Sequence, residues 1–102
     1  MLAKLAGESR LAFKKHALVR MYQRKILANE VRDALLKGEI VETYPSDKPL
    51  PSFLVLGYTS QKRPLHVVVA LDTEEEMGWI ITVYQPSSKE WEEGFRVRRR
   101  RV

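Results

Sequence analysis

The sequence predicts an α+β fold in which two N-terminal helices pack on a four-stranded antiparallel sheet. Two observations carry this prediction. Apolar residues recur at helical spacing between residues 9 and 38, whereas from Glu39 onward they alternate with polar residues or form short runs. Short polar connections separate the predicted strands, and such connections favour antiparallel neighbours.

The first predicted helix runs from Ser9 to about Lys25. Ser9 is a good N-cap because its hydroxyl can accept a hydrogen bond from an unpaired backbone amide. Leu11, Leu18 and Tyr22 line one side of this helix, and we expect that side to face the core.

The second predicted helix begins near Asn29, which is also a good N-cap. Val31, Ala34 and Leu35 give this helix an apolar face. Gly38 is placed to end it in the left-handed conformation.

Four strands follow as the segments EIVETY, SFLVLGYT, PLHVVVALD and MGWIITVYQ. The last two are apolar on both faces, so at least one of them should be central and covered on both sides. Two helices can cover only one face of so small a sheet. The second face therefore needs a partner protein, the C-terminal segment or a substrate groove.

The length of 102 residues corresponds to one domain, which we assign to residues 1–95, followed by an arginine-rich tail at residues 96–102. The absence of cysteine excludes disulfides and thiolate metal sites and fits the cytosol. No apolar stretch is long enough for a signal peptide or a membrane span. The expectation is a cytoplasmic protein without a membrane partner.

Charge is segregated along the chain. Residues 1–32 carry a balance of +6, residues 33–95 a balance of −6, and the tail RVRRRRV adds five arginines. Basic ends around an acidic middle favour an oriented encounter with a polyanion. For the acidic middle, a simple solubilising role is the preferred interpretation.

One of the two histidines lies in the segment HALVRMYQR. His16, Arg20 and Arg24 follow one another at four-residue spacing and form a basic stripe if the segment is helical. Imidazole can exchange a proton near neutral pH, and arginine is suited to gripping phosphate oxygens. The stripe therefore indicates chemistry on phosphodiesters.

The other histidine, His66, lies near the start of an apolar strand, shortly after Lys62 and Arg63. Strand alternation places His66 on the same face as Thr82 and Tyr84 when the more apolar faces pair. Tyr58 joins this face unless the preceding glycine marks a bulge. Such a face would form a polar groove suited to base stacking.

The sequence resembles a prokaryotic family called domain of unknown function 4258 over roughly residues 14–92. The resemblance is carried by His-Ala-Leu-x-Arg-Met-x-Gln-Arg-x-Ile at 16–26, Glu30-Val31, Gly38-Glu39-Ile40-Val41-Glu42-x-Tyr44-Pro45, Pro51-Ser52, Gly57-Tyr58, Arg63-Pro64-Leu65-His66-Val67-Val68 and Thr82-x-Tyr84-x-Pro86. Members of that family look like relatives of the RelE and BrnT toxin ribonucleases, which have two helices packed on an antiparallel sheet.

The resemblance implies the toxin of a type II toxin–antitoxin system, which cleaves RNA without a metal or another cofactor. It also implies a cognate antitoxin, of which a zinc-finger protein of the YgiT/MqsA type is one candidate. RNA supplies its own nucleophile, the 2′-hydroxyl, so cleavage needs a base, an acid and a cation to stabilise the phosphorane.

The types of the side chains suggest which residues take part in RNA cleavage. We predict His16, His66, Arg20 and Tyr84 as catalytic residues, with the two histidines as base and acid. The predicted substrate-binding residues are Arg24, Tyr58, Lys62, Arg63, Thr82, Arg98, Arg99, Arg100 and Arg101.

Each assignment has a plainer alternative. The histidines can be structural, the helix arginines can pair with Glu30, Glu39 or Glu42, and the tail can be a frayed end, an extra edge strand or an antitoxin contact. The acidic run at residues 74–76 is a solvated turn rather than a metal site. At the level of function, the alternatives are a non-catalytic RNA- or protein-binding module and a degenerate toxin.

Overall fold

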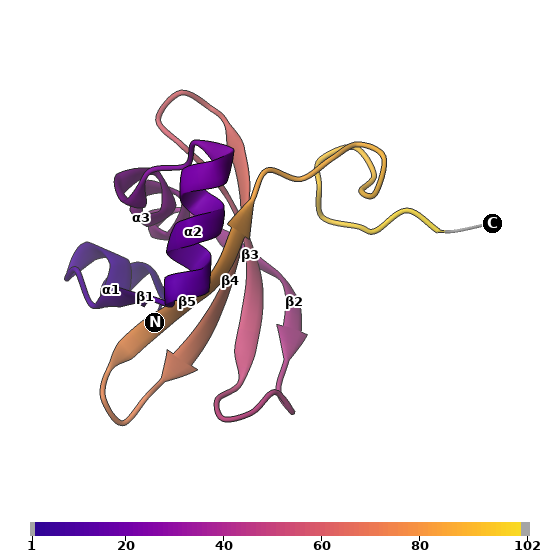
Figure 1. Cartoon of the computed structure of the whole chain (residues 1–102). Helices are drawn as coiled ribbons and strands as arrows, with labels where there is room; N and C mark the ends of the chain where they lie inside the picture. Colours follow the sequence, from indigo (N-terminus) through magenta and orange to yellow (C-terminus); the bar gives the residue numbers. More distant parts are fainter. Residues whose placement is uncertain (1, 101–102) are drawn as a thin grey trace.

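The computed structural model describes residues 2–100, which form three helices on one face of a five-stranded mixed sheet (Figure 1). In chain order the elements are α1 (Leu2–Gly7), β1 (Leu11–Phe13), α2 (Lys15–Arg24), α3 (Ala28–Leu36), β2 (Glu39–Tyr44), β3 (Ser52–Tyr58), β4 (Pro64–Asp72) and β5 (Met77–Tyr84). The α+β class is thus confirmed. None of the helices in this part of the chain is long and apolar enough to span a membrane.

The sheet has the strand order β1-β5-β4-β3-β2. Strands β2 to β5 form the predicted antiparallel meander, with β3 and β4 inside the sheet. The prediction of only four antiparallel strands is wrong, because β1 adds a fifth strand that pairs with β5 in parallel. The added strand covers the lower part of an edge that β5 would otherwise leave unpaired.

The first predicted helix is also corrected. Ser9 adopts a positive φ of 56° instead of capping a helix, and α2 starts only at Lys15. Residues before it form the short helix α1 and then β1. The guanidinium of Arg10 donates hydrogen bonds of 2.7 Å to the carbonyls of Glu75 and Glu76, which fixes this segment to the turn between β4 and β5.

The buried side of α2 differs from the predicted one. Ala17 and Met21 face the core, whereas Leu18 is 48% exposed and Tyr22 is 87% exposed. Both pairs are apolar residues at four-residue spacing, so periodicity alone does not distinguish them. The prediction that Leu18 and Tyr22 line the core is therefore wrong.

Helix α3 buries Val31, Ala34 and Leu35, as predicted. Its N-cap is Leu27 rather than Asn29, and the backbone amide of Leu27 donates to the carboxylate of Glu30 at 2.9 Å. Gly38 does not adopt the predicted left-handed conformation. Close packing explains the glycine instead, because a Cβ there would lie 2.5 Å from a methyl group of Val55.

The core lies between the helices and the sheet. On the opposite face of the sheet, the C-terminal segment (residues 85–100) leaves the end of β5 and crosses toward β2 (Figure 1). Trp91 of this segment is only 2% exposed. The C-terminal segment is therefore the cover for part of the second face, one of the three possibilities that the sequence left open.

Candidate functional site

His66 is completely buried on the sheet face opposite the helices. It pairs with Tyr84 across β4 and β5, and the two rings meet edge to face with centroids 5.3 Å apart. Trp91 packs against the other side of the imidazole at 4.4 Å. Strand pairing also places Thr82 opposite Val68, so the predicted grouping of His66, Thr82 and Tyr84 on one face is confirmed.

Both ring nitrogens of His66 have partners. Nε2 lies 2.9 Å from the carbonyl oxygen of Phe95, and Nδ1 lies 3.2 Å from the hydroxyl of Tyr84. A carbonyl can only accept, so Nε2 carries the proton, and in the neutral ring Nδ1 accepts from the Tyr84 hydroxyl. Burial lowers the pKa of His66 and raises that of Tyr84.

A second polar group joins β2 to the C-terminal segment beside His66. Arg98 grips the Glu42 carboxylate with hydrogen bonds of 2.8 and 3.1 Å, and its guanidinium lies 4.6 Å from the centre of the Trp91 ring. The Tyr44 hydroxyl also donates to Glu42. The hydrogen bond from Arg98 lowers the pKa of Glu42, while burial raises the pKa of Tyr44.

We call His66, Tyr84, Trp91, Glu42 and Arg98 the strap network, because they hold the C-terminal segment on the sheet. Glu42, Tyr44 and Trp91 were not among the site residues predicted from the sequence. The alternation of EIVETY was the available signal for the first two, since it puts Glu42 and Tyr44 on one side of β2. Trp91 follows no periodic pattern.

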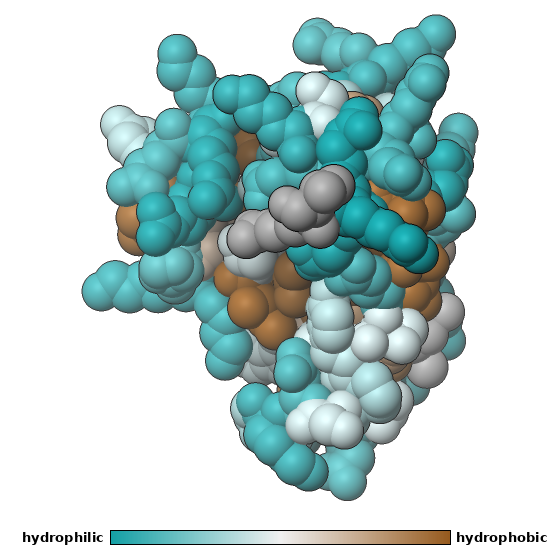
Figure 2. All heavy atoms as spheres, turned by 90° about the vertical axis from the view of Figure 1, so that its right-hand side faces the viewer, coloured by the Kyte–Doolittle hydropathy of each residue, from teal (hydrophilic) through white to brown (hydrophobic). Residues whose placement is uncertain are grey.

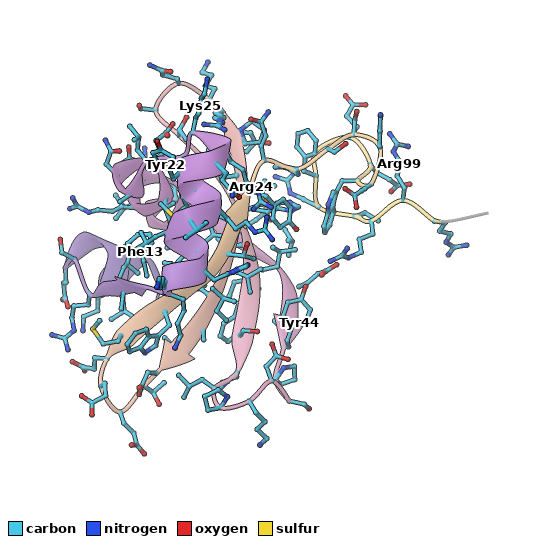
Figure 3. The ribbon with its side chains drawn as sticks, viewed as in Figure 1. Phe13, Tyr22, Arg24, Lys25, Tyr44 and Arg99 are labelled. Carbon is cyan, nitrogen blue, oxygen red and sulfur yellow. The ribbon has the colours of Figure 1, made fainter. Side chains whose placement is uncertain are left out.

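His16 and Arg20 lie together on the exposed surface of α2. Arg20 Nε donates to His16 Nε2 over 3.4 Å, a long hydrogen bond, and the Arg20 guanidinium is 3.5 Å from the side chain of Gln23. Arg24 continues the stripe and donates to the backbone carbonyl of Val83 on β5 at 2.7 Å. Figure 3 shows Arg24 where α2 meets the upper end of β5. Arg24, at the end of the stripe, therefore lies at the part of the β5 edge that β1 leaves open.

The two histidines are not brought together. Helix α2 packs on the face of the sheet that the helices cover, where it contacts β5. His66 points to the opposite face, beneath the C-terminal segment (Figure 1). An acid–base pair of His16 and His66 is not formed in this arrangement. His66 is also shielded from any bound molecule by Trp91 and Phe95.

Arg63 closes the C-terminal end of α2. Its guanidinium donates to the carbonyls of Arg24 and Lys25 at 3.1 and 3.0 Å and to the side chain of Gln85 at 2.9 Å. Cationic groups are favourable where helix carbonyls lack partners. Lys62, the preceding residue, is exposed in a turn with a positive φ of 64°.

The remaining predicted binding residues are dispersed. Tyr58 lies beside α3, where it lines a surface hollow with Asp33 and Leu36, although its neighbour Gly57 pairs regularly and forms no bulge. Arg99 is held within the C-terminal segment by the carbonyl of Ser88, away from α2 (Figure 3). Arg100 is exposed, and Arg101 lies outside the described residues.

Within residues 2–100, no group of three or more His, Asp or Glu side chains is placed to hold a metal ion.

Acidification should destabilise the protein in two steps. The pKa of His66 is below its ordinary value of 6.5, so the unfolded chain binds the extra proton first and stability falls as the pH drops below about 6.5. The lowered pKa of Glu42 gives stability above its ordinary value of 4.5 that is lost below it. Urea unfolding between about pH 8 and pH 3 measures both steps. In His66→Gln the upper step should disappear; its persistence would assign the step to another group.

These features define a small α+β protein with a basic helix edge and a buried imidazole under a C-terminal cover. The chain belongs to the family described as domain of unknown function (DUF4258), whose family model matches residues 13–85. The match includes His16, Glu42, His66 and Tyr84 but ends before Trp91. Comparisons with curated proteins and with solved structures find no match.

Proposed function

We propose that this protein is a RelE-like toxin of a type II toxin–antitoxin system that cleaves RNA without a metal, in the cytoplasm. The observation that carries the proposal is the exposed pair of His16 and Arg20 on α2, followed one turn later by Arg24 at the open edge of β5. An imidazole and a guanidinium side by side supply a proton acceptor and a phosphate ligand at the same point. The resemblance of the sequence to the family related to toxin ribonucleases supports the same proposal.

The reaction assigned to this edge is transesterification. His16 Nε2 takes the proton from the 2′-hydroxyl, the 2′-oxygen bonds to phosphorus, and the bond from phosphorus to the 5′-oxygen breaks. Solvent water gives the 5′-oxygen its proton, and the products carry a 2′,3′-cyclic phosphate and a 5′-hydroxyl. Arg20 stabilises the phosphorane. Its 3.4 Å hydrogen bond to His16 is weak enough to exchange for a phosphate oxygen, which frees Nε2 to act.

A second candidate is a non-catalytic RNA- or protein-binding module, including a degenerate toxin. The burial of His66 favours it, because only one of the two imidazoles is then accessible to a substrate. Both candidate functions use the basic stripe on α2. In both, the proposed protein partner is a cognate antitoxin, for example of the YgiT/MqsA zinc-finger type.

Incubation of labelled single-stranded RNA with purified protein in EDTA tests the proposal. Wild type should cleave, His16→Ala should lower the rate by roughly 10²–10⁴-fold, and Arg20→Ala by about 10²-fold. Lys37→Ala removes one exposed positive charge at the end of α3 and serves as the charge control, with a rate near wild type. Equal rates in wild type and His16→Ala would overturn the catalytic assignment, and binding without cleavage by wild type would favour the module. A loss of cleavage in a stably folded His66→Gln variant would return His66 to the catalytic residues.

A further inference from the structure

The sheet face opposite the helices is only partly covered. The C-terminal segment lies over its upper part, and Figure 2 shows an apolar patch with residues of intermediate hydropathy open to solvent below that segment. On this face, a hollow of about 280 Å³ is lined by the apolar side chains of Leu50, Ala70, Trp79 and Ile81 and by Lys14 and Lys48. None of these residues takes part in the strap network.

We propose that this hollow binds one base of a single-stranded RNA, stacked on Trp79, with the adjoining phosphates on Lys14 and Lys48. The inference rests on the proposed function, because it names a substrate-binding subsite for the same RNA. It adds to that function a preference for unpaired nucleotides, since only an unstacked base can enter the hollow.

The indole of Trp79 is partly exposed. Trp79 pairs with Ala70 across β4 and β5, which places its side chain on the face away from the helices. The ammonium of Lys14 lies 4.7 Å from the centre of its ring. A base that takes this place gains stacking energy, and the displaced ammonium becomes available to a phosphate one step along the backbone.

The size of the hollow fits one base. Its volume is just below the range of roughly 300–1,000 Å³ typical of small-molecule sites, so it suits a single planar ring system rather than a larger ligand. Its lining is mainly apolar and includes two lysines. Asp47 also lines the hollow, and its carboxylate accepts a hydrogen bond of 2.5 Å from the Ser52 hydroxyl.

The position of the hollow determines the direction in which a bound RNA strand runs over the surface. Lys14 directly precedes α2, so the hollow adjoins the end of the helix that carries His16. The turn at residues 73–76, which leads into β5 shortly before Trp79, carries three glutamates and repels a phosphate backbone. A strand anchored on Trp79 is therefore directed from the hollow toward His16 and Arg20.

Fluorescence of Trp79 provides the test, because the chain has only two tryptophans. In Trp91→Phe, Trp79 is the sole indole, and a short single-stranded RNA should quench its emission. Affinities from fluorescence anisotropy should show about 5- to 150-fold weaker RNA binding in Trp79→Leu than in wild type. Trp79→Phe keeps an aromatic surface and should retain most of the affinity. An abasic oligonucleotide of equal length should bind wild type and Trp79→Leu alike.

The outcomes separate this inference from the proposed function. RNA binding by wild type with equal affinity in Trp79→Leu, confirmed as folded by thermal unfolding, would overturn the subsite while leaving the function standing. Absence of RNA binding by wild type would overturn both. Binding of polyglutamate that depends on Trp79 would assign the hollow to an acidic peptide instead and would also overturn the subsite.

Discussion

Gly57→Ala should lower the free energy of unfolding by about 3 kcal/mol, because helix α3 leaves no space for a side chain at this position. A Cβ on Gly57 would lie 2.1 Å from the carbonyl oxygen of Ala34 and 2.6 Å from its carbonyl carbon. Both atoms belong to the helix backbone, so no rotamer change relieves the clash. The helix has to move off β3, and the apolar contacts between them loosen.

Gly57→Ala also has a stabilising effect, which is smaller than the destabilisation caused by the clash. Replacing glycine by alanine restricts the unfolded chain and stabilises by about 0.4–1 kcal/mol where the native backbone tolerates it. Gly7→Ala measures that effect alone, since its Cβ would meet only a methyl group of Leu36 at 3.6 Å. Urea unfolding should therefore show Gly57→Ala much less stable than wild type and Gly7→Ala equal or slightly more stable. Wild-type stability in Gly57→Ala would mean that α3 packs less closely on β3 than described.

Adding Ala34→Gly to Gly57→Ala should not restore stability. This second change removes the Ala34 side chain, whereas the clash involves Ala34 backbone atoms. Failure of the rescue thus distinguishes a backbone clash from simple overfilling of the core.

Much of the fold follows from patterns in the sequence, and the exceptions have physical causes. Strands β2 to β5 and the apolar face of α3 are predictable because their patterns extend over six residues or more. Strand β1 has only three residues, too few for any periodicity, and it exists because the edge of β5 offers it backbone partners. The choice between Met21 and Tyr22 as a core residue likewise depends on how α2 settles on β5, a tertiary effect.

In the candidate site, too, some features could be predicted from the sequence and others could not. Alternation within β4 and β5 is sufficient to predict that His66 and Tyr84 share a face. It does not predict what covers them, because the C-terminal segment has no regular pattern and its contacts depend on single residues such as Trp91. The exposed pair of His16 and Arg20 is predictable, since four-residue spacing brings side chains together on any helix.

His66→Ala should lower the free energy of unfolding by about 3–4 kcal/mol and release the C-terminal segment. The change leaves a cavity in a completely buried position and removes the partner of both the Tyr84 hydroxyl and the Phe95 carbonyl. Trp91 also loses the imidazole against which it packs at 4.4 Å. Each kcal/mol should lower the melting temperature of a domain of this size by roughly 4–8 °C.

His16→Ala is the matched control, because it removes the same side chain from an exposed position and should change stability by less than about 0.5 kcal/mol. Trypsin provides a second measurement, since the segment from Arg96 to Arg100 offers several cleavage sites. Cleavage there should be faster in His66→Ala than in either His16→Ala or wild type, since an unfastened segment enters the protease more often. If both histidine variants unfold and are cleaved like wild type, the imidazole of His66 does not fasten the segment, and its burial has to be attributed to Trp91 and the Arg98–Glu42 pair alone.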